Sequence, residues 1–155
     1  MRTIIVYTSV AHGNTEKVAK AMAEASGAEL TRTGEITPEA LSRYDTVGFG
    51  SGIYNGRHHQ NIFDLVAGLP ASFDKKAFVF STSGYGTTKP NQKLIKALEG
   101  KRFKISGDFA CKGFDTAGIN KLYAGAAKGR PNEEDLQGAR NFAKKFISFG
   151  THSLI

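Results

Sequence analysis

The chain of 155 residues has the length of one domain, and at this size about two thirds of the unfolded surface can be buried. Its single cysteine, Cys111, excludes an intrachain disulfide, which favours a reducing, cytoplasmic setting. No apolar run approaches the roughly 20 residues of a membrane span and no signal segment is visible, so we expect a soluble protein. The net charge of +7 indicates an anionic partner, but the basic residues are spread along the chain, so nucleic-acid binding is not expected.

Apolar runs of strand length alternate with segments of helical periodicity. In chain order, we expect a strand at 3–7, a helix around the stripe Val18, Met22 and Ala23, a weaker strand at 29–33, a strand at 46–50, a helix around Ile62, Leu65, Val66 and Leu69, a strand at 77–80, a helix around Leu94, Ile95 and Leu98, a strand at 108–111, and a helix that begins near Pro131 and carries Phe142, Ala143, Phe146 and Ile147. This alternation predicts an α/β fold, a single doubly wound domain over residues 1–155 with a five-stranded parallel sheet covered on both faces.

The segment from Thr8 to Thr15 joins the first strand to the first helix and is typical of an anion-binding turn. Backbone N–H groups at the start of a helix lack intrahelical partners and lie at the positive end of the helix dipole. Ser9, Asn14 and Thr15 add side-chain donors, and Gly13 allows close approach of the backbone. Neither a P-loop lysine nor a G-x-G-x-x-G motif is present here, which disfavours an NTPase or a dinucleotide-binding Rossmann domain. An ordinary N-cap is the alternative interpretation of Asn14 and Thr15.

Two later loops are rich in glycine, and each carries a tyrosine in its middle. The segment 50–59 follows the third strand and contains Tyr54, and the segment 81–88 follows the fourth strand and contains Tyr85. In a doubly wound sheet, ligands bind outside the carboxyl ends of the strands, so both tyrosines are expected beside the anion-binding turn. Such a pair would clamp a flat ring, and each ring contact adds about 0.5 to 1.5 kcal/mol beyond area burial.

With these segments the chain resembles the flavodoxin family over nearly its whole length. The resemblance runs from the motif Ser9-x-x-x-Gly13-Asn14-Thr15 through 50–54 and 81–84 to the segment 111–116. It implies a flavodoxin-like sheet with strand order 2-1-3-4-5 and FMN as the cofactor. The FMN-binding residues that it implies are Ser9, Ala11, His12, Gly13, Asn14, Thr15, Ser51, Gly52, Ile53, Tyr54, Asn55, Gly56, Ser81, Thr82, Ser83, Gly84 and Tyr85.

The resemblance also implies a role for each of these groups. The phosphate would lie on Ser9 and the turn 12–15, with Tyr54 against one face of the isoalloxazine and Tyr85 near the other. The segment 81–84 would hydrogen-bond the ring edge. His12 departs from the usual threonine-rich turn and is a candidate phosphate ligand.

Two further departures concern charge and backbone freedom. Flavodoxins are usually acidic, whereas this chain is basic. Asn55 stands where electron-transfer flavodoxins often have a glycine whose peptide flips towards the reduced ring. Asparagine tolerates a positive φ less freely than glycine, so we expect that flip to be costlier here.

The cluster Arg57-His58-His59 has two interpretations at this stage. It can form a solvated face at the start of the third helix, or it can place a cation near the flavin. If one positive charge stabilised the anionic reduced flavin by about 1.4 kcal/mol, the one-electron potential would rise by about 59 mV. Adjacent histidines do not readily chelate one ion, so no metal site is expected. The basic connection from Lys112 to Arg130 either docks an acidic partner or covers a substrate, or it is only a surface excursion or a short helix.

The leading functional interpretation is an FMN-binding electron carrier between a reductase or ferredoxin-like donor and an oxidoreductase acceptor. The sequence shows no general base, activated nucleophile or metal site, and a carrier needs none because the flavin does the chemistry. The alternative is an FMN-dependent enzyme, since the segment 50–59 is also similar to the corresponding loop of menaquinone-dependent protoporphyrinogen oxidases. Those enzymes carry a longer insertion after the fourth strand, which this chain lacks, and a small quinone reductase remains a second option.

Overall fold

The computed structural model describes residues 2–10, 13–113 and 129–152, with the side chains of the last helix up to residue 145. Its strands are β1 (Thr3–Thr8), β2 (Glu29–Arg32), β3 (Thr46–Tyr54), β4 (Arg57–His58), β5 (Lys76–Ser83) and β6 (Lys104–Lys112). Its helices are α1 (Asn14–Ser26), α2 (Pro38–Leu41), α3 (Gln60–Ala67), α4 (Gln92–Gly100) and α6 (Glu133–His152), with short 3-10 helices η1 (Thr33–Glu35) and η2 (Lys89–Asn91). Ala11 and His12 from the predicted site, and most of the predicted connection 112–130, lie outside the described residues.

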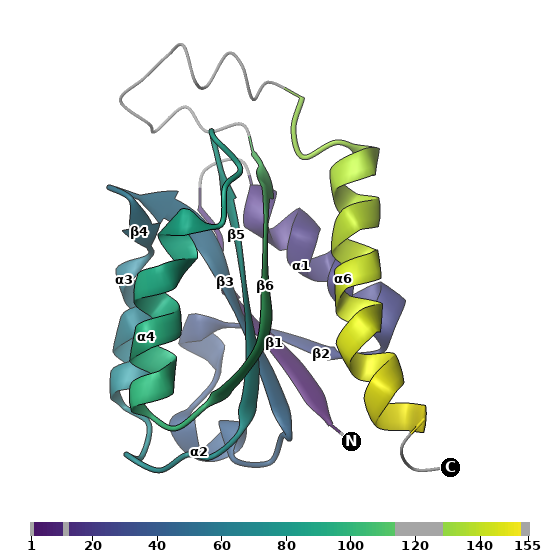
Figure 1. The fold of residues 1–155 in the computed structure, drawn as a ribbon. Coiled ribbons are helices and arrows are strands. Elements are labelled where there is room, and N and C mark those ends of the chain that lie inside the picture. Colours follow the sequence, from purple (N-terminus) through teal and green to yellow (C-terminus); the bar gives the residue numbers. More distant parts are fainter. Residues whose placement is uncertain (1, 11–12, 114–128, 153–155) are drawn as a thin grey trace.

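The longer strands pair in parallel in the order β2-β1-β3-β5-β6, which confirms the predicted α/β fold and strand order. The short strand β4 pairs antiparallel with the end of β3 and was not predicted. Because the other strands are parallel, their carboxyl ends share one edge of the sheet, at the top of Figure 1. The predicted ligand loops therefore meet at that edge. None of the described helices combines the length and the apolar composition that crossing a membrane requires.

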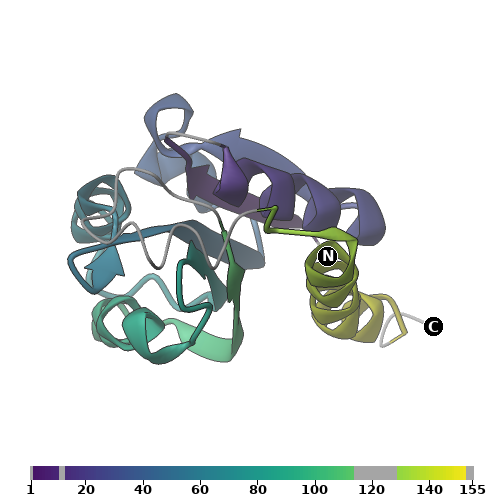
Figure 2. The same ribbon diagram turned by 90° about the horizontal axis from the view of Figure 1, so that it is seen from above.

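Helices cover both faces of the sheet. Seen from above, α3 and α4 lie on one side and α1 and α6 on the other (Figure 2). Strand β1 is buried along its whole length, as expected for a central parallel strand. Its side chains alternate: Ile4 and Val6 join the core under α3 and α4, whereas Ile5 and Tyr7 join the core under α1 and α6.

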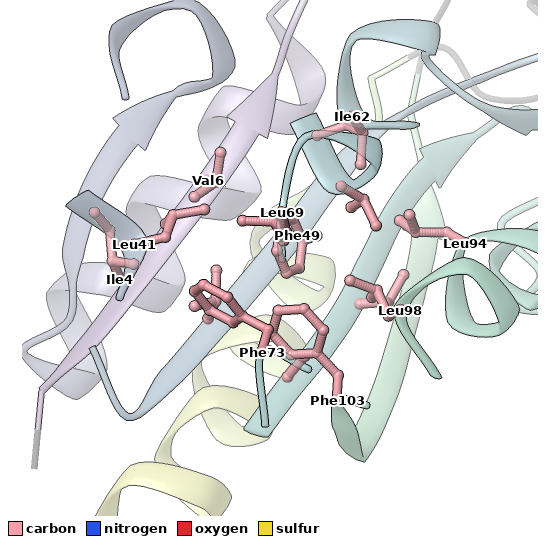
Figure 3. Packing of buried hydrophobic residues seen from close by; sticks show 14 of the residues in the cluster. Ile4, Val6, Leu41, Phe49, Ile62, Leu69, Phe73, Leu94, Leu98 and Phe103 are labelled. Carbon is pink, nitrogen blue, oxygen red and sulfur yellow. The ribbon is translucent and has the colours of Figure 1, made fainter. Parts of the chain in front are cut away.

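The core under α3 and α4 is aliphatic and aromatic (Figure 3). Leu94 and Leu98 of α4 reach the sheet in it, and both are fully buried. Phe103 meets Phe49 edge to face, with ring centroids 5.7 Å apart. The i, i+4 spacing of the two leucines places them on one side of the helix, which is why the sequence pattern predicted α4 correctly.

Glycines of β3 leave room for the phenylalanine rings of β5 on the other face. Gly48 pairs with Phe78 and Gly50 with Phe80 in the parallel register. A Cβ at Gly48 would lie 2.4 Å from the ring of Phe78, and one at Gly50 would lie 2.2 Å from Cζ of Phe80. The rings therefore lie directly across the β3 backbone, and this close packing holds the middle of the sheet together.

Candidate functional site

The first helix begins at a glycine. Its N-cap residue is Gly13, at φ 68° in the left-handed region, and this residue has no side chain that could cap the helix. Asn14 and Thr15 lie inside the helix, so the alternative interpretation of either residue as the N-cap is wrong. One N–H group of the first turn is satisfied from outside, because Glu16 N donates to Ser9 Oγ at 3.2 Å. Among the described residues, no atom lies within 4 Å of a Cβ built on Gly13, so the glycine itself leaves space beside the positive end of α1.

Residues from four segments of the chain meet at the start of this helix. Thr15 is buried, and its Oγ1 lies 2.9 Å from Oγ1 of Thr82 at the end of β5. A hollow of about 20 Å³ is lined by Val10, Asn14, Thr15, Gly52, Tyr54, Thr82 and Gly113. The structure therefore brings together five of the predicted residues and adds Val10 and Gly113. A larger residue than glycine at position 113 would crowd Asn14, because a Cβ there would lie 3.0 Å from the Asn14 side chain.

The acidic residue beside the helix start is neutralised by its neighbours. Oε2 of Glu16 accepts hydrogen bonds from Tyr7 Oη at 2.9 Å and from Arg32 Nη2 at 2.7 Å. Lys20 Nζ lies 3.4 Å from Oε1. These partners, the Tyr7 hydroxyl first, hold the pKa of Glu16 below its usual value. An anion at the start of α1 therefore meets an ion-paired carboxylate rather than an isolated negative charge.

A tight hairpin places Tyr54 at the hollow. Strand β3 turns into β4 through Asn55 at φ 52° and Gly56 at φ 78°, with Tyr54 paired to Arg57. Two consecutive positive φ angles are typical of the type I′ turn, which asparagine followed by glycine favours. The Tyr54 ring meets the His59 ring edge to face at 5.2 Å, and its hydroxyl would lie 3.0 Å from a Cβ on Gly52. Tyr54 is thus packed from two sides, while Asn55 and Gly56 are exposed.

His58 does not lie on a solvated face, so that interpretation of the cluster is wrong for this residue. It is 1% exposed, and it belongs to β4. Its Nδ1 lies 2.8 Å from Ser51 Oγ, and its Nε2 lies 2.7 Å from Asn91 Oδ1. Burial lowers the pKa of His58 to about 4, against a smaller opposing effect of the Asn91 hydrogen bond. The imidazole is therefore neutral at physiological pH and is not a cation near the site.

The two neighbours of His58 have different environments. His59 is the N-cap of α3, and its Nδ1 accepts from Asn61 N at 3.0 Å. Arg57 is half-buried, with Cζ 4.1 Å from the centroid of the Phe63 ring. Its Nε is buried and has no hydrogen-bond partner among the described residues. Of the three, Arg57 alone brings a permanent charge to the end of the β3–β4 hairpin.

The remaining predicted residues among those described do not line the hollow. Ser51 and Ser81 are fully buried within the sheet, and Ser81 Oγ has no hydrogen-bond partner within the described part of the chain. Ser83 Oγ accepts from Gly86 N at 2.9 Å, which shapes the loop after β5. Gly84 follows in that loop, and Ile53 pairs with His58. Tyr85 is 60% exposed and borders a groove between the end of β6 and the start of α6.

Sequence reasoning missed the buried connection behind the hollow. Asn91 Nδ2 donates to Asp108 Oδ2 at 3.2 Å and to the Phe109 carbonyl at 3.3 Å, and its Oδ1 meets His58. Asn91 is fully buried at the start of α4. No sequence pattern connects an asparagine after Pro90 with a histidine 33 positions earlier. The Asn–Gly pair of the hairpin, by contrast, was a usable signal for β4.

The chain is similar to known proteins in sequence and in fold. Residues 4–113 match the flavodoxin domain family. An uncharacterized protein of Methanocaldococcus jannaschii is 42% identical over 149 residues, which cover 95% of this chain and 99% of that protein. A flavodoxin from the domain Archaea superposes with a TM-score of 0.69 at 16% identity, covering 96% of this chain and 97% of its own.

Two further solved structures share the fold. A short-chain flavodoxin associated with a bacterial microcompartment gives a TM-score of 0.71 at 15% identity, with 96% of this chain and 99% of its own covered. Rubredoxin oxygen:oxidoreductase from Desulfovibrio gigas gives 0.70 at 16% identity, and 99% of this chain covers 37% of that larger protein. The family match over residues 4–113, together with this fold, shows that the chain belongs to the flavodoxin domain family.

Proposed function

We propose that this protein binds FMN at the carboxyl edge of its sheet and serves as a flavodoxin-type electron carrier. The observation that carries the proposal is the meeting of the start of α1 with a tyrosine at one hollow. The start of α1 suits a phosphate, because its N–H groups and dipole favour an anion. Tyr54 suits a flat ring, because an aromatic face gains energy from stacking.

The donor set fits the cofactor. Gly13 leaves space at the helix start, and Thr15 places a hydroxyl beside it. The charge of Glu16 is offset by Arg32 and Lys20, which reduces its repulsion of a phosphate. When bound there, FMN would supply the redox chemistry, since the isoalloxazine takes up and releases electrons. The protein would contribute orientation and electrostatics.

Two reactive groups near the site support a carrier rather than an enzyme with a catalytic side chain. His58 is buried and hydrogen-bonded at both ring nitrogens, so it is not presented to a substrate. Cys111 is buried, and burial, with the charge of Asp135, raises the pKa of its thiol to about 12. A thiol with that pKa is not a nucleophile at neutral pH.

The partners in this proposal are redox proteins: a reductase or a ferredoxin-like donor, and an oxidoreductase acceptor. The net charge of +7 suits an acidic docking face on at least one of them. Such an association is electrostatic, so its rate should fall as salt is added.

The cofactor assignment is tested by titrating the purified protein with FMN and following flavin fluorescence. Thr15→Ala should weaken FMN binding roughly tenfold, because one hydrogen bond at a charged ligand contributes about 1.5 to 3 kcal/mol and part of it is replaced by water. Thr15→Ser keeps the hydroxyl and should retain the affinity. Ser106→Ala, at an exposed position of β6, is the matched control. Equal affinities for Thr15→Ala and the unaltered protein would remove Thr15 from the phosphate site.

The carrier role is tested by adding NADH or NADPH to the FMN-loaded protein without any reductase. A carrier should keep its oxidised visible spectrum until a reductase is supplied. Rapid bleaching by a nicotinamide alone, reversed by a quinone, would instead make the protein an FMN-dependent oxidoreductase. Absence of FMN binding in the unaltered protein would contradict the proposal as a whole.

A further inference from the structure

We infer that His58 is a positioning residue, which holds the end of β3 in the shape that the proposed FMN site needs. Ser51, His58 and Asn91 connect three elements, β3, β4 and η2, by side-chain hydrogen bonds. Ser51 directly precedes Gly52, which lines the hollow, and Tyr54 follows two positions later. The inference rests on the proposed function, because it concerns the loop that would contact the flavin.

The hydrogen-bond directions in this connection follow from its far end. The amide nitrogen of Asn91 lies 3.2 Å from Asp108 Oδ2 and 3.3 Å from the Phe109 carbonyl, and both of these oxygens can only accept. The amide group is therefore oriented with Oδ1 towards His58. Since Oδ1 also accepts, His58 Nε2 must carry a hydrogen and donate it across 2.7 Å.

The near end of the connection is determined in turn. A neutral imidazole with its hydrogen on Nε2 has an accepting Nδ1, so Ser51 Oγ donates to it across 2.8 Å. The same oxygen accepts from the His59 N–H at 3.0 Å. The Gly52 carbonyl lies only 2.7 Å from Ser51 Oγ and is the competing acceptor for the single hydroxyl hydrogen. Neutral His58 thus decides which acceptor Ser51 uses.

This arrangement braces the hairpin where the backbone ladder is shortest. Strand β4 has only two residues, and its pairs with β3 are Ile53–His58 and Tyr54–Arg57. A two-residue ladder is weak by itself. The bonds through Ser51 add a tie across the hairpin, and Asn91 extends that tie to β6. A buried polar chain in which every member is satisfied makes its surroundings rigid, and so His58 limits the movement of the Gly52–Tyr54 backbone.

A first test concerns the tautomer of His58 in the protein without FMN. Nitrogen-15 NMR of the imidazole should show a hydrogen on Nε2 and none on Nδ1 at neutral pH. A hydrogen on Nδ1 would overturn the assigned directions. This spectroscopic signature does not depend on cofactor binding.

A second test measures the brace itself through hydrogen exchange of the His59 amide, whose acceptor is Ser51 Oγ. His58→Gln keeps a donor towards Asn91 but removes the acceptor for Ser51, and should speed this exchange about tenfold, the equivalent of one neutral hydrogen bond. His58→Asn places an oxygen near the position of Nδ1 and should restore slow exchange. Leu98→Ala, at a buried position at the opposite end of α4, is the control for a general loss of stability. The reference amide is that of Gly86, which is bonded to Ser83 Oγ and not to Ser51. Leu98→Ala should leave the ratio of the His59 exchange rate to the Gly86 exchange rate unchanged. The inference would be overturned if this ratio of exchange rates were unchanged in His58→Gln, or if slow His59 exchange were not restored in His58→Asn.

The consequence for the cofactor is measured with the same variants. His58→Gln should raise the FMN dissociation constant about five- to tenfold, whereas Leu98→Ala should not change it. An unchanged affinity in His58→Gln would show that the brace does not serve the FMN site. If the unaltered protein does not bind FMN, the proposed function fails, while the His59 exchange still decides whether His58 holds the end of β3.

Discussion

Acidification should destabilise this protein through His58. The imidazole is 1% exposed, and its pKa falls from 6.5 to about 4 on folding because burial penalises its charged form. The unfolded chain therefore binds a proton that the folded protein rejects at pH values between about 4 and 6.5. The stability contributed by neutral His58 is fully present above pH 6.5 and is lost as the pH falls towards about 4.

The size of this effect follows from the two pKa values. The difference between 6.5 and about 4, at about 1.4 kcal/mol per pH unit, amounts to about 3 kcal/mol in the free energy of unfolding. Protonation would also force the chain of hydrogen bonds to rearrange, since Nδ1 could no longer accept from Ser51. Of the charged side chains nearby, Asp108 is separated from His58 by Asn91, and Arg57 is directed at Phe63.

The assay is urea unfolding, followed by circular dichroism, at a series of pH values from neutral down to about 4. Carboxylates titrate in part of this range, but they are common to all variants and cancel in a comparison. His58→Gln should lose most of the dependence between pH 6.5 and about 4, whereas His59→Gln, which leaves His58 in place, should retain it. If His58→Gln lost stability on acidification as steeply as the unaltered protein, the burial of a neutral His58 would be refuted.

Two substitutions test the sheet and the start of α6. Gly50→Ala should lower the free energy of unfolding by about 1 to 3 kcal/mol, because its Cβ would lie 2.2 Å from the Phe80 ring. The control is Gly100→Ala, whose Cβ would meet no atom within 4 Å in the described part of the chain, and it should change this free energy by less than about 0.5 kcal/mol. Equal urea midpoints for the two variants would contradict this packing. Asp135→Asn should lower the free energy of unfolding by about 1.5 to 3 kcal/mol at neutral pH, because it removes the charged partner of Arg130. The Arg130 guanidinium holds the pKa of the Asp135 carboxyl below its usual value, so the stability from this pair is lost as the pH falls through the folded pKa. A thermal melt of Asp135→Asn that matched the unaltered protein at neutral pH would show that the Arg130 pair does not stabilise the fold.

The main features of the fold were predictable from the sequence because they depend on local patterns. The run 3–7 is apolar apart from Thr3, as expected for a strand covered on both faces, and β1 is buried along its whole length. The i, i+4 pair Leu94 and Leu98 predicted α4 in the same way. Cys111, in the segment 108–111 that was predicted as a strand, is buried in β6. Parallel strands then bring the loop ends together, so the meeting of Asn14 and Tyr54 also followed from the pattern.

What the pattern could not decide is how a polar side chain is satisfied once it is buried. His58 reads as a surface residue, because two polar neighbours surround it and a two-residue strand has no periodicity. Only the packed structure brings Asn91 to one of its ring nitrogens and Ser51 to the other. In the same way, only the structure shows that the Ser51 hydroxyl is buried and hydrogen-bonded to His58 and to the His59 N–H.

The sequence alone therefore determined the α/β class, the strand order through the resemblance to flavodoxins, and the edge of the sheet where a ligand would bind. Each of these depends on hydrophobic periodicity or on a short motif, which are properties of neighbouring residues. The tertiary structure decided the hydrogen bonds of His58, its neutral state and the position of Gly13 as the N-cap of α1. These depend on burial and on partners from distant parts of the chain, because the free energy of a polar group is set by the surroundings that only folding creates.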